Sequence, residues 1–254
     1  MVDVHCHILS GMDDGAKSFE DSLAMAEAAI ADGITHVVAT PHANGEFHFD
    51  FAAVQRAAGK LQRELGARLL LATGCDFHLS PENIAALKKG PTAFCIHQKD
   101  YLLVEFNDFS IPPAMDQTLY EIQLAGIRPV ITHPERNAIL RAQPQRLEQW
   151  IRNGCYAQVT GGSLTGAFGA NALQNAMAWI ARGLVHIVAS DAHNLTTRPH
   201  KLRAAYDLVQ REFGRAQAKA LFVENPLAVF EGRGLPHVPE ITESVGKKKR
   251  FGFF

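Results

Sequence analysis

Two short motifs in this sequence place histidine and carboxylate side chains at a spacing suited to metal binding. His5 and His7 are separated by one residue, and Asp191 and His193 repeat that spacing. On a β-strand, side chains two residues apart point to the same face, so each pair can contact one ion. Imidazole and carboxylate together suit Zn, Mn or Fe. The two pairs therefore predict a metal site.

Further histidines and carboxylates stand where other apolar, strand-like runs end. One such residue alone is more often a hydrogen-bonded loop residue, but the pattern recurs at six predicted strand ends. One tetrahedral ion takes about four ligands, so a larger set favours two or three divalent ions that share bridging carboxylates. The predicted ligands are His5, His7, Asp14, His42, Asp76, Glu105, His133, Asp191 and His193. The remaining histidines, His36, His48, His78, His97, His186, His200 and His237, are assigned to structural or surface roles.

Arg136 follows His133 by three residues, so a guanidinium is expected beside the metal site. Clustered divalent ions generate a hydroxide nucleophile at neutral pH, and arginine is the favoured partner of phosphate oxygens. These residues together predict hydrolysis of a phosphorylated substrate, with Arg136 as the phosphate clamp. Arg198 is a weaker second candidate for that clamp. His42 and His193 are the candidates for moving a proton to the leaving group.

A cysteine-based mechanism is excluded by spacing. Thiol-dependent tyrosine phosphatases need an arginine six residues after the cysteine. The residues at that distance from Cys6, Cys75, Cys95 and Cys155 are Met12, Pro81, Tyr101 and Gly161. Any removal of phosphate from tyrosine must therefore use a metal-activated hydroxide.

The elements that must position these residues alternate between short strands and longer helices. Predicted strands cover 2–5, 35–39, 68–72, 101–106, 128–132, 156–160 and 185–189. Predicted helices cover 18–32, 51–65, 81–89, 114–125, 146–153, 170–182 and 200–231, the last with a break at Asn225-Pro226. Such alternation predicts a parallel sheet in an α/β fold, and about seven units favour a distorted TIM-like (β/α)7 barrel. A doubly wound open sheet is the alternative, but the sequence has no glycine-rich phosphate loop.

Composition sets the remaining limits. The 254 residues carry a net charge of −1, and Lys247–Arg250 supply four of the positive charges, so residues 1–246 carry −5. The acidic body disfavours nucleic acid as a partner. No signal peptide or membrane span is recognised, which predicts a cytoplasmic protein. One domain is expected over 1–246, followed by a basic, aromatic tail over 247–254. The tail is either a solvated end or a weak contact for an anionic membrane surface.

Several motifs resemble those of the PHP superfamily (polymerase and histidinol phosphatase), in particular its bacterial protein-tyrosine phosphatases. They are the opening DVHCHILSGMDDGAKS, then ATPH, LVE, THPER and SDAH, in order over nearly the whole chain. The resemblance implies a distorted barrel with up to three metals, usually manganese, bound by the nine predicted ligands, with Arg136 on the phosphate. It also implies a phosphotyrosine protein as substrate, such as a membrane-associated tyrosine kinase of capsule or exopolysaccharide synthesis. The sequence departs from the family at Asp76, where Glu is more typical.

Other functions remain open from the sequence. A histidinol-phosphate phosphatase, or another small-molecule phosphoesterase of the superfamily, would use the same metal cluster. An amidohydrolase-type deaminase or amidase also begins with HxH on a barrel, but that class often bridges its metals with a modified lysine where this chain has Glu105. A non-catalytic, metal-stabilised binding module and a nucleic-acid exonuclease complete the alternatives.

Overall fold

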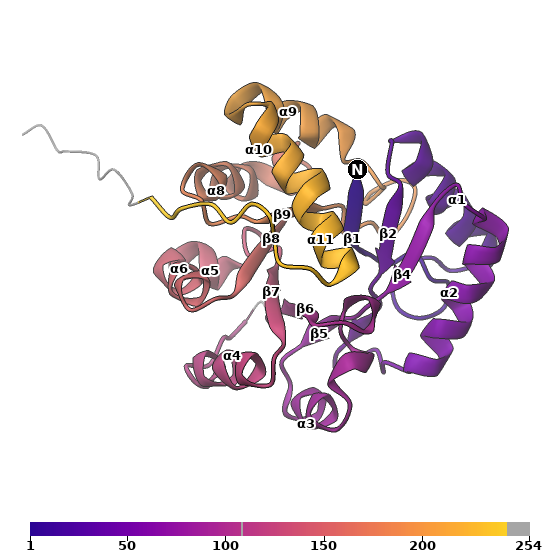
Figure 1. Cartoon of the computed structure of the whole chain (residues 1–254), viewed down its shortest axis with the longest axis horizontal. Coiled ribbons are helices and arrows are strands. Elements are labelled where there is room, and N and C mark those ends of the chain that lie inside the picture. The colour runs from indigo at the N-terminus through magenta and orange to yellow at the C-terminus, as the bar shows by residue number, and fades with distance from the viewer. Residues whose placement is uncertain (108, 243–254) are drawn as a thin grey trace, which may run out of the picture.

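The computed structural model describes residues 1–107 and 109–242, and it shows strands surrounded by helices (Figure 1). The longer strands are β1 (Val2–Cys6), β2 (His36–Ala39), β4 (Leu70–Thr73), β6 (Tyr101–Glu105), β7 (Arg128–Thr132), β8 (Tyr156–Thr160) and β9 (Ile187–Ala189). All strand pairs that these elements form are parallel. The predicted α/β barrel is confirmed, since consecutive parallel strands are joined through helices.

Two strand units are interrupted, and this interruption distorts the barrel. After β2, the chain bends at Thr40-Pro41 and continues as β3 (His42–Ala43); after β4, it bends at Gly74-Cys75 and continues as β5 (Asp76–His78). Strands β1, β2 and β4 form one sheet, whereas β3 and β5 pair into a second sheet with β6, β7, β8 and β9. The bends bring the side chains of His42 and Asp76 into register as direct neighbours.

The two sheets meet again where β9 lies beside β1. One isolated parallel bridge joins Cys6 to Ala192, and the amide of His7 donates to the carbonyl of Ala192 at 2.8 Å. The amide of Asp191 donates to the carbonyl of His5 at 2.9 Å. This short join places the ends of the first and last strands side by side, and both carry predicted ligands.

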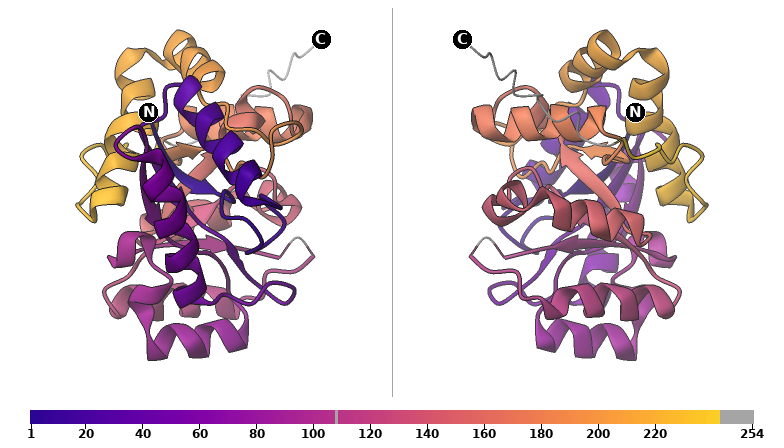
Figure 2. Two further views of the ribbon diagram at one scale, coloured as in Figure 1. Left: turned by 90° about the vertical axis from the view of Figure 1, so that its right-hand side faces the viewer. Right: turned by 90° about the vertical axis from the view of Figure 1, so that its left-hand side faces the viewer.

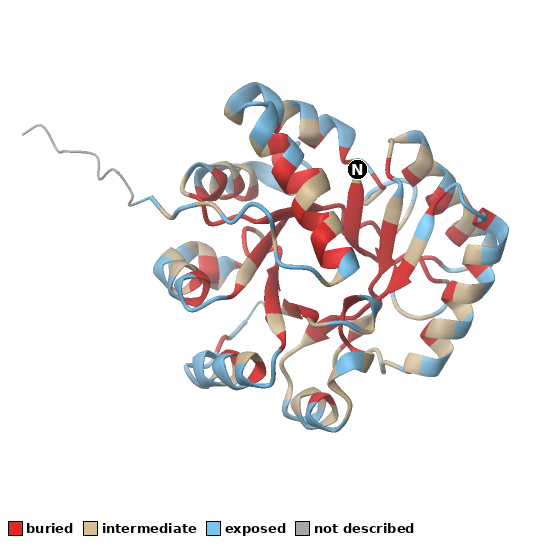
Figure 3. Cartoon of the chain, viewed as in Figure 1, coloured by how far each residue is buried: buried red, intermediate tan, exposed pale blue. Residues whose placement is uncertain are grey.

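Helices cover the outside of the strands, with their apolar faces inward and their polar faces exposed (Figure 3). They are α1 (Phe19–Ala31), α2 (Phe51–Leu65), α3 (Pro81–Lys89), α4 (Ala114–Leu124), α5 (Ala138–Ala142), α6 (Pro144–Arg152), α7 (Gly161–Leu164), α8 (Gly169–Ala181), α9 (Arg203–Phe213), α10 (Arg215–Lys219) and α11 (Asn225–Glu231). Short helical turns span Pro91–Ala93, Ile96–Gln98 and Ala220–Glu224. Ser80 caps the start of α3, because its side chain accepts a hydrogen bond from the amide of Asn83.

Helix α11 closes the end of the barrel at which the strands begin. Its residues Val229 and Phe230 pack into an interior cluster with strand residues such as Val4, Val38 and Leu103. Figure 2 shows the last helices at one end of the molecule and long loops at the other. The loops that follow the strands are therefore at the open end, which is where the sequence places the ligands. The predicted boundary between 1–246 and the tail 247–254 lies outside the described residues and stays a prediction.

Candidate metal centre

The deepest part of the site joins three elements at the seam between the sheets. His5 lies in β1, Asp76 begins β5, and Asp191 follows β9; their side chains are essentially inaccessible to solvent. The Nε2 atom of His5 is 3.4 Å from Asp76 Oδ2 and 3.5 Å from Asp191 Oδ1. His7 faces the same carboxylate, with its Nε2 3.4 Å from Asp191 Oδ1 and 3.3 Å from His5 Nε2. The side chains of His5 and His7 therefore point to the same face of the strand, as their spacing predicts.

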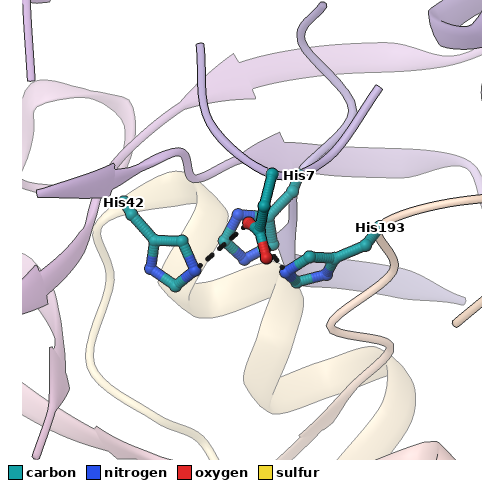
Figure 4. A group of neighbouring side chains, drawn as sticks. His7, His42 and His193 are labelled. Atoms are coloured by element: carbon teal, nitrogen blue, oxygen red, sulfur yellow. Dashed lines mark ion pairs between the residues drawn. The ribbon is translucent and has the colours of Figure 1, made fainter. Parts of the chain in front are cut away.

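A second, more accessible part surrounds Asp14. Its Oδ1 lies 3.6 Å from His42 Nε2 and 3.3 Å from His193 Nε2. Figure 4 shows the rings of His7, His42 and His193 converging on one point, with dashed lines that mark the two ion pairs. The Asp14 side chain is 48% exposed, in contrast to the buried Asp76 and Asp191. Substrate and solvent can therefore reach this side of the site.

His42 connects the two parts, because both of its ring nitrogens face carboxylates. Its Nδ1 is 3.3 Å from Asp76 Oδ2 and 3.4 Å from Glu105 Oε2, while its Nε2 faces Asp14. Glu105 ends β6 and reaches His133, whose Nε2 lies 3.4 Å from Glu105 Oε1. All nine predicted ligands consequently belong to one continuous cluster of side chains.

Hydrogen bonds from outside the cluster orient two of the histidines. Gln158 Oε1 lies 2.9 Å from His5 Nδ1; because this oxygen only accepts, Nδ1 carries a proton, and Nε2 is the nitrogen that faces the cluster and can bind an ion. Asp13 Oδ2 lies 2.5 Å from His7 Nδ1 and orients that ring in the same way, with Nε2 toward the cluster. Such partners set the tautomer and orientation of metal-binding histidines. The sequence predicted no role for Gln158.

A separate buried network lies behind β1. Asp3 Oδ2 accepts a hydrogen bond from the Ser190 hydroxyl at 2.5 Å and lies 3.1 Å from His200 Nδ1. Asp3 Oδ1 accepts from the amides of Ser190, at 2.9 Å, and His5. Hydrogen bonds thus engage both Asp3 oxygens, and the network holds the residues just before Asp191. Its role is to support the loop that carries Asp191.

Two arginines converge on one oxygen of Asp191. Arg136 Nη1 donates to Asp191 Oδ2, and Arg198 Nη2 donates to the same atom at 2.5 Å. The guanidinium of Arg136 also lies over the ring of Phe168, 4.3 Å from its centre. Both arginine side chains remain 25% exposed. They present free N–H groups at the mouth of the site, where an anion can be bound.

Ionised carboxylates set the electrostatics of the cluster. The positive histidines and arginines hold the pKa of Asp191 well below its usual range against burial, which alone would raise it. Burial and Asp76 raise the pKa of Glu105, yet the neighbouring rings of His42 and His78 bring it to about 2. Burial and then Arg136 lower the pKa of His133 to about 4, so this ring is neutral at pH 7. Five ionised carboxylates (Asp13, Asp14, Asp76, Glu105 and Asp191) face two guanidiniums and the rings of His5 and His42, whose pKa neighbouring carboxylates raise, against burial, to about 9 and about 11. Divalent cations bound to this cluster would replace the protons of these histidines.

The donor atoms fit metal ions in geometry as well as in charge. Three groups of side chains have ligand atoms that lie within 4.8 Å of one another: His7–Asp14–His42–His193, His5–His7–Asp76 and His42–Asp76–Glu105. His7, His42 and Asp76 each belong to two of these groups. Bonds of ~2.0–2.2 Å to a tetrahedral ion would separate ligand atoms by ~3.3–3.6 Å, as the measured pairs are. His42 Nδ1, Asp76 Oδ2 and His193 Nε2 are buried without a hydrogen-bond partner. Buried polar atoms left unpaired in this way are expected where an ion binds.

Strained backbone at the site indicates that these positions are held for function. His133 has φ of 32° and Asp191 has φ of 52°, in the left-handed region that non-glycine residues rarely adopt. The loop bearing Asp13 and Asp14 is equally constrained. A Cβ atom on Gly15 would lie 2.0 Å from the carbonyl oxygen of His7, so only glycine fits there. Backbone conformation at such sites is maintained by the surrounding structure.

Some site residues escaped prediction from the sequence. His78, assigned to a structural role, lies with its Nε2 2.5 Å from Glu105 Oε2. It stands two residues after Asp76 and repeats the D-x-H spacing of Asp191 and His193. That spacing could have identified it, had β5 been predicted. Arg198, only a weaker candidate, occupies a place equivalent to that of Arg136.

The four cysteines are buried, free thiols. Burial raises the pKa of Cys6 and Cys75 well above the usual range, and that of Cys95 and Cys155 to about 12. Thiols of this kind are poor nucleophiles at neutral pH. This agrees with the exclusion of a cysteine mechanism.

The barrel and its His/carboxylate cluster define a metal-dependent hydrolase. The family model "Capsular polysaccharide synthesis, CpsB/CapC" matches residues 1–231, and the chain belongs to that family. It is 36% identical to the tyrosine-protein phosphatase YwqE of Bacillus subtilis (100% of both chains) and 32% identical to the tyrosine-protein phosphatase CpsB of Streptococcus pneumoniae (91% of this chain, 98% of the relative).

Solved structures agree with this family. One is described as "Crystal structures of YwqE from Bacillus subtilis and CpsB from Streptococcus pneumoniae, unique metal-dependent tyrosine phosphatases". It matches with a TM-score of 0.88 and 34% identity, and covers 96% of this chain and 100% of that one. A D-hydantoinase shares the fold alone, with a TM-score of 0.51 and 15% identity over 94% of this chain and 73% of that one. Among the described residues, the structure contains no helix with the length and apolarity needed to cross a bilayer.

Proposed function

We propose that this protein is a metal-dependent protein-tyrosine phosphatase of capsular polysaccharide synthesis, and that the nine clustered residues bind its ions. The observation that carries the proposal is the cluster itself, with its unpaired buried atoms and two arginines at the mouth. The names of the relatives support tyrosine phosphate as the substrate class. The bound ions are two or three divalent cations. Manganese is proposed, with iron or zinc as alternatives, because the donors are nitrogen and oxygen.

Bound divalent ions supply a hydroxide nucleophile at neutral pH and neutralise charge on phosphate oxygens. The protein's own residues then bind and orient the ester. Arg136 and Arg198 donate to phosphate oxygens from the two sides of Asp191, and Phe168 holds the Arg136 guanidinium in place. Gln158 and Asp13 keep the lone pairs of His5 and His7 directed into the cluster.

Proton delivery to the leaving group is assigned to His42 rather than His193. The Nδ1 of His193 donates to the backbone carbonyl of Asp191 at 3.0 Å, which leaves one nitrogen for the cluster. Both nitrogens of His42 lie inside the cluster, so one can bind metal while the other retains a proton. Tyrosinate, whose conjugate acid has a pKa of about 10, departs with little assistance. The role of His42 is therefore modest.

The biological setting follows from the family. The proposed substrate is a phosphotyrosine protein, such as a membrane-associated tyrosine kinase that controls capsule or exopolysaccharide synthesis, and the proposed location is the cytoplasm. The basic and aromatic tail, residues 247–254, could add a weak contact to an anionic membrane surface. That segment lies outside the described residues.

The function is tested by assaying the purified chain on a phosphotyrosine peptide and on p-nitrophenyl phosphate, with histidinol phosphate as the control substrate. We expect hydrolysis of both aryl esters, loss of activity after chelation, and recovery when Mn²⁺ is added back. Faster hydrolysis of histidinol phosphate than of the aryl esters would show that the proposed substrate class is wrong. Activity on the aryl esters that survives complete removal of metal would contradict the mechanism.

A further inference from the structure

A cavity of about 320 Å³ opens directly beside the metal centre, between the loops that follow β5 and β6. His78 and Glu105 form the wall that it shares with the cluster. Its apolar lining consists of Leu79, Pro81, Phe106, Pro112 and Met115, and uncharged polar residues complete it: Ser80, Asn107 and Ser110. Its volume lies at the lower end of the ~300–1,000 Å³ range of small-molecule sites. This cavity is therefore large enough for an aromatic ring, since a buried cavity of about 150 Å³ can hold benzene.

Two other cavities also adjoin proposed ligands, and their chemistry differs. The cavity at His42 measures about 210 Å³ and includes His48 and Asp50. The cavity at His193 measures about 290 Å³ and includes Lys17 and Asp21. In the cavity at Glu105, by contrast, the ionisable side chains among the described lining residues are His78 and Glu105, which pair with each other. Burial of an uncharged ring is therefore most favourable in the cavity at Glu105, because the ring displaces water from apolar groups there.

The same cavity is connected to the phosphate-binding arginine. Asn107, which lines it, accepts a hydrogen bond through its carbonyl oxygen from Asn137 Nδ2 at 3.2 Å, and Asn137 follows Arg136 in the chain. Because Glu105 lines the cavity, a phosphate held by Arg136 beside Glu105 would lie next to the cavity. Ser110 and Pro112 at its rim are exposed, so a peptide backbone can pass outside while one side chain enters.

We propose that this cavity receives the aromatic ring of phosphotyrosine, with Met115 and Leu79 as its apolar walls. The proposal rests on the proposed phosphatase function and adds the basis of its preference for aryl over alkyl phosphate esters. Met115 lies in the first turn of α4 and is partly buried. Its flexible thioether makes favourable contacts with aromatic rings, and it can adapt to a ring that enters and leaves.

The test uses binding to the metal-loaded full chain, measured by calorimetry, so that it does not depend on turnover. The probes are phenylphosphonate, which carries a ring, and inorganic phosphate, which does not. We expect Met115→Ala to reduce the preference for phenylphosphonate over phosphate about tenfold, as expected for a lost apolar contact in a binding pocket. Ser110→Phe, an exposed change at the rim, should reduce it as well by filling the entrance. Leu195→Ala is the matched control, since it truncates a half-exposed apolar residue at the cavity beside His193.

The outcomes separate the two proposals. An unchanged preference in both Met115→Ala and Ser110→Phe, or a loss of preference in Leu195→Ala instead, would overturn the ring site while tyrosine phosphatase activity stands. If the wild-type chain prefers phenylphosphonate but does not hydrolyse a phosphotyrosine peptide, the proposed function fails and the ring site remains. A thermal unfolding measurement on each variant identifies any that fail to fold.

Discussion

Two buried histidines at opposite ends of the barrel, His186 and His5, have opposite pKa shifts. At the end where the strands begin, His186 is 1% exposed, and its Nδ1 accepts a hydrogen bond from the amide of Ala157. Burial lowers its pKa to about 4. At the other end, His5 is fully buried, but Asp76 and Asp191 outweigh the effect of burial and raise its pKa to about 9. Burial alone keeps a histidine neutral, whereas the carboxylates at the open end attract positive charge of any kind, including metal ions.

The largest expected effect comes from removing the charge of Asp191, one of the two carboxylates that raise the pKa of His5. Asp191→Asn keeps the size of the side chain, and asparagine tolerates the left-handed backbone at this position. It removes the charge that faces His5, His7 and both arginines, so we expect a loss of kcat/KM beyond the ~10–100-fold typical of an outer hydrogen-bond partner. Metal content by elemental analysis should fall in parallel. A folded variant with full metal content and full activity would remove Asp191 from the centre.

An intermediate effect is expected from the partner that orients His5. Gln158→Leu leaves His5 Nδ1 without its acceptor while the metal-facing atoms remain in place. We expect metal affinity to fall about 10–100-fold, with activity recovered at high metal concentration. Gln149→Leu is the control, because Gln149 forms an exposed hydrogen bond to Asn153 on α6. Equal metal affinity in the two variants would show that Gln158 acts only on packing.

The smallest effect on activity, and a distinct effect on stability, is expected at the opposite end. Because the folded pKa of His186 is about 4 and its ordinary value is 6.5, protons bind preferentially to the unfolded chain. The free energy of unfolding is therefore full above pH 6.5 and falls as the pH drops toward 4, by up to about 3 kcal/mol from this residue. His186→Gln should flatten the change in urea-unfolding stability between pH 7 and pH 5 while leaving kcat/KM at pH 7 intact. A slope identical to that of the wild type would show that other groups cause it.

Much of the fold could be predicted because its elements carry strong local patterns. The strands at 128–132 and 156–160 and the helices at 51–65 and 81–89 have the predicted bounds. The two-residue strand β3 and the three-residue strand β5 were missed, because such short segments show no periodicity. Without these two strands, neither the division into two sheets nor the contact of His78 with Glu105 can be predicted.

The site was predictable where residue type and spacing carry the information. All nine predicted ligands lie in the cluster, because strand ends converge at one edge whatever the detailed register. Which of two adjacent carboxylates faces which ring depends on loop geometry: Asp14 faces His42 and His193, while Asp13 binds His7. The roles of Gln158 and Phe168 depend on contacts between distant segments, which one sequence does not specify.

The narrow join between β1 and β9 has a consequence for the integrity of the barrel. A single bridge and a few hydrogen bonds hold the three-stranded sheet to the six-stranded sheet there. His5 and His7 belong to one side of this join, and Asp191 and His193 belong to the other. Any ion bound by residues from both sides is a cross-link that closes the cylinder. The metal centre would then also hold the two sheets together. In the chain without its ions, we expect amide hydrogen exchange to be fastest along this join.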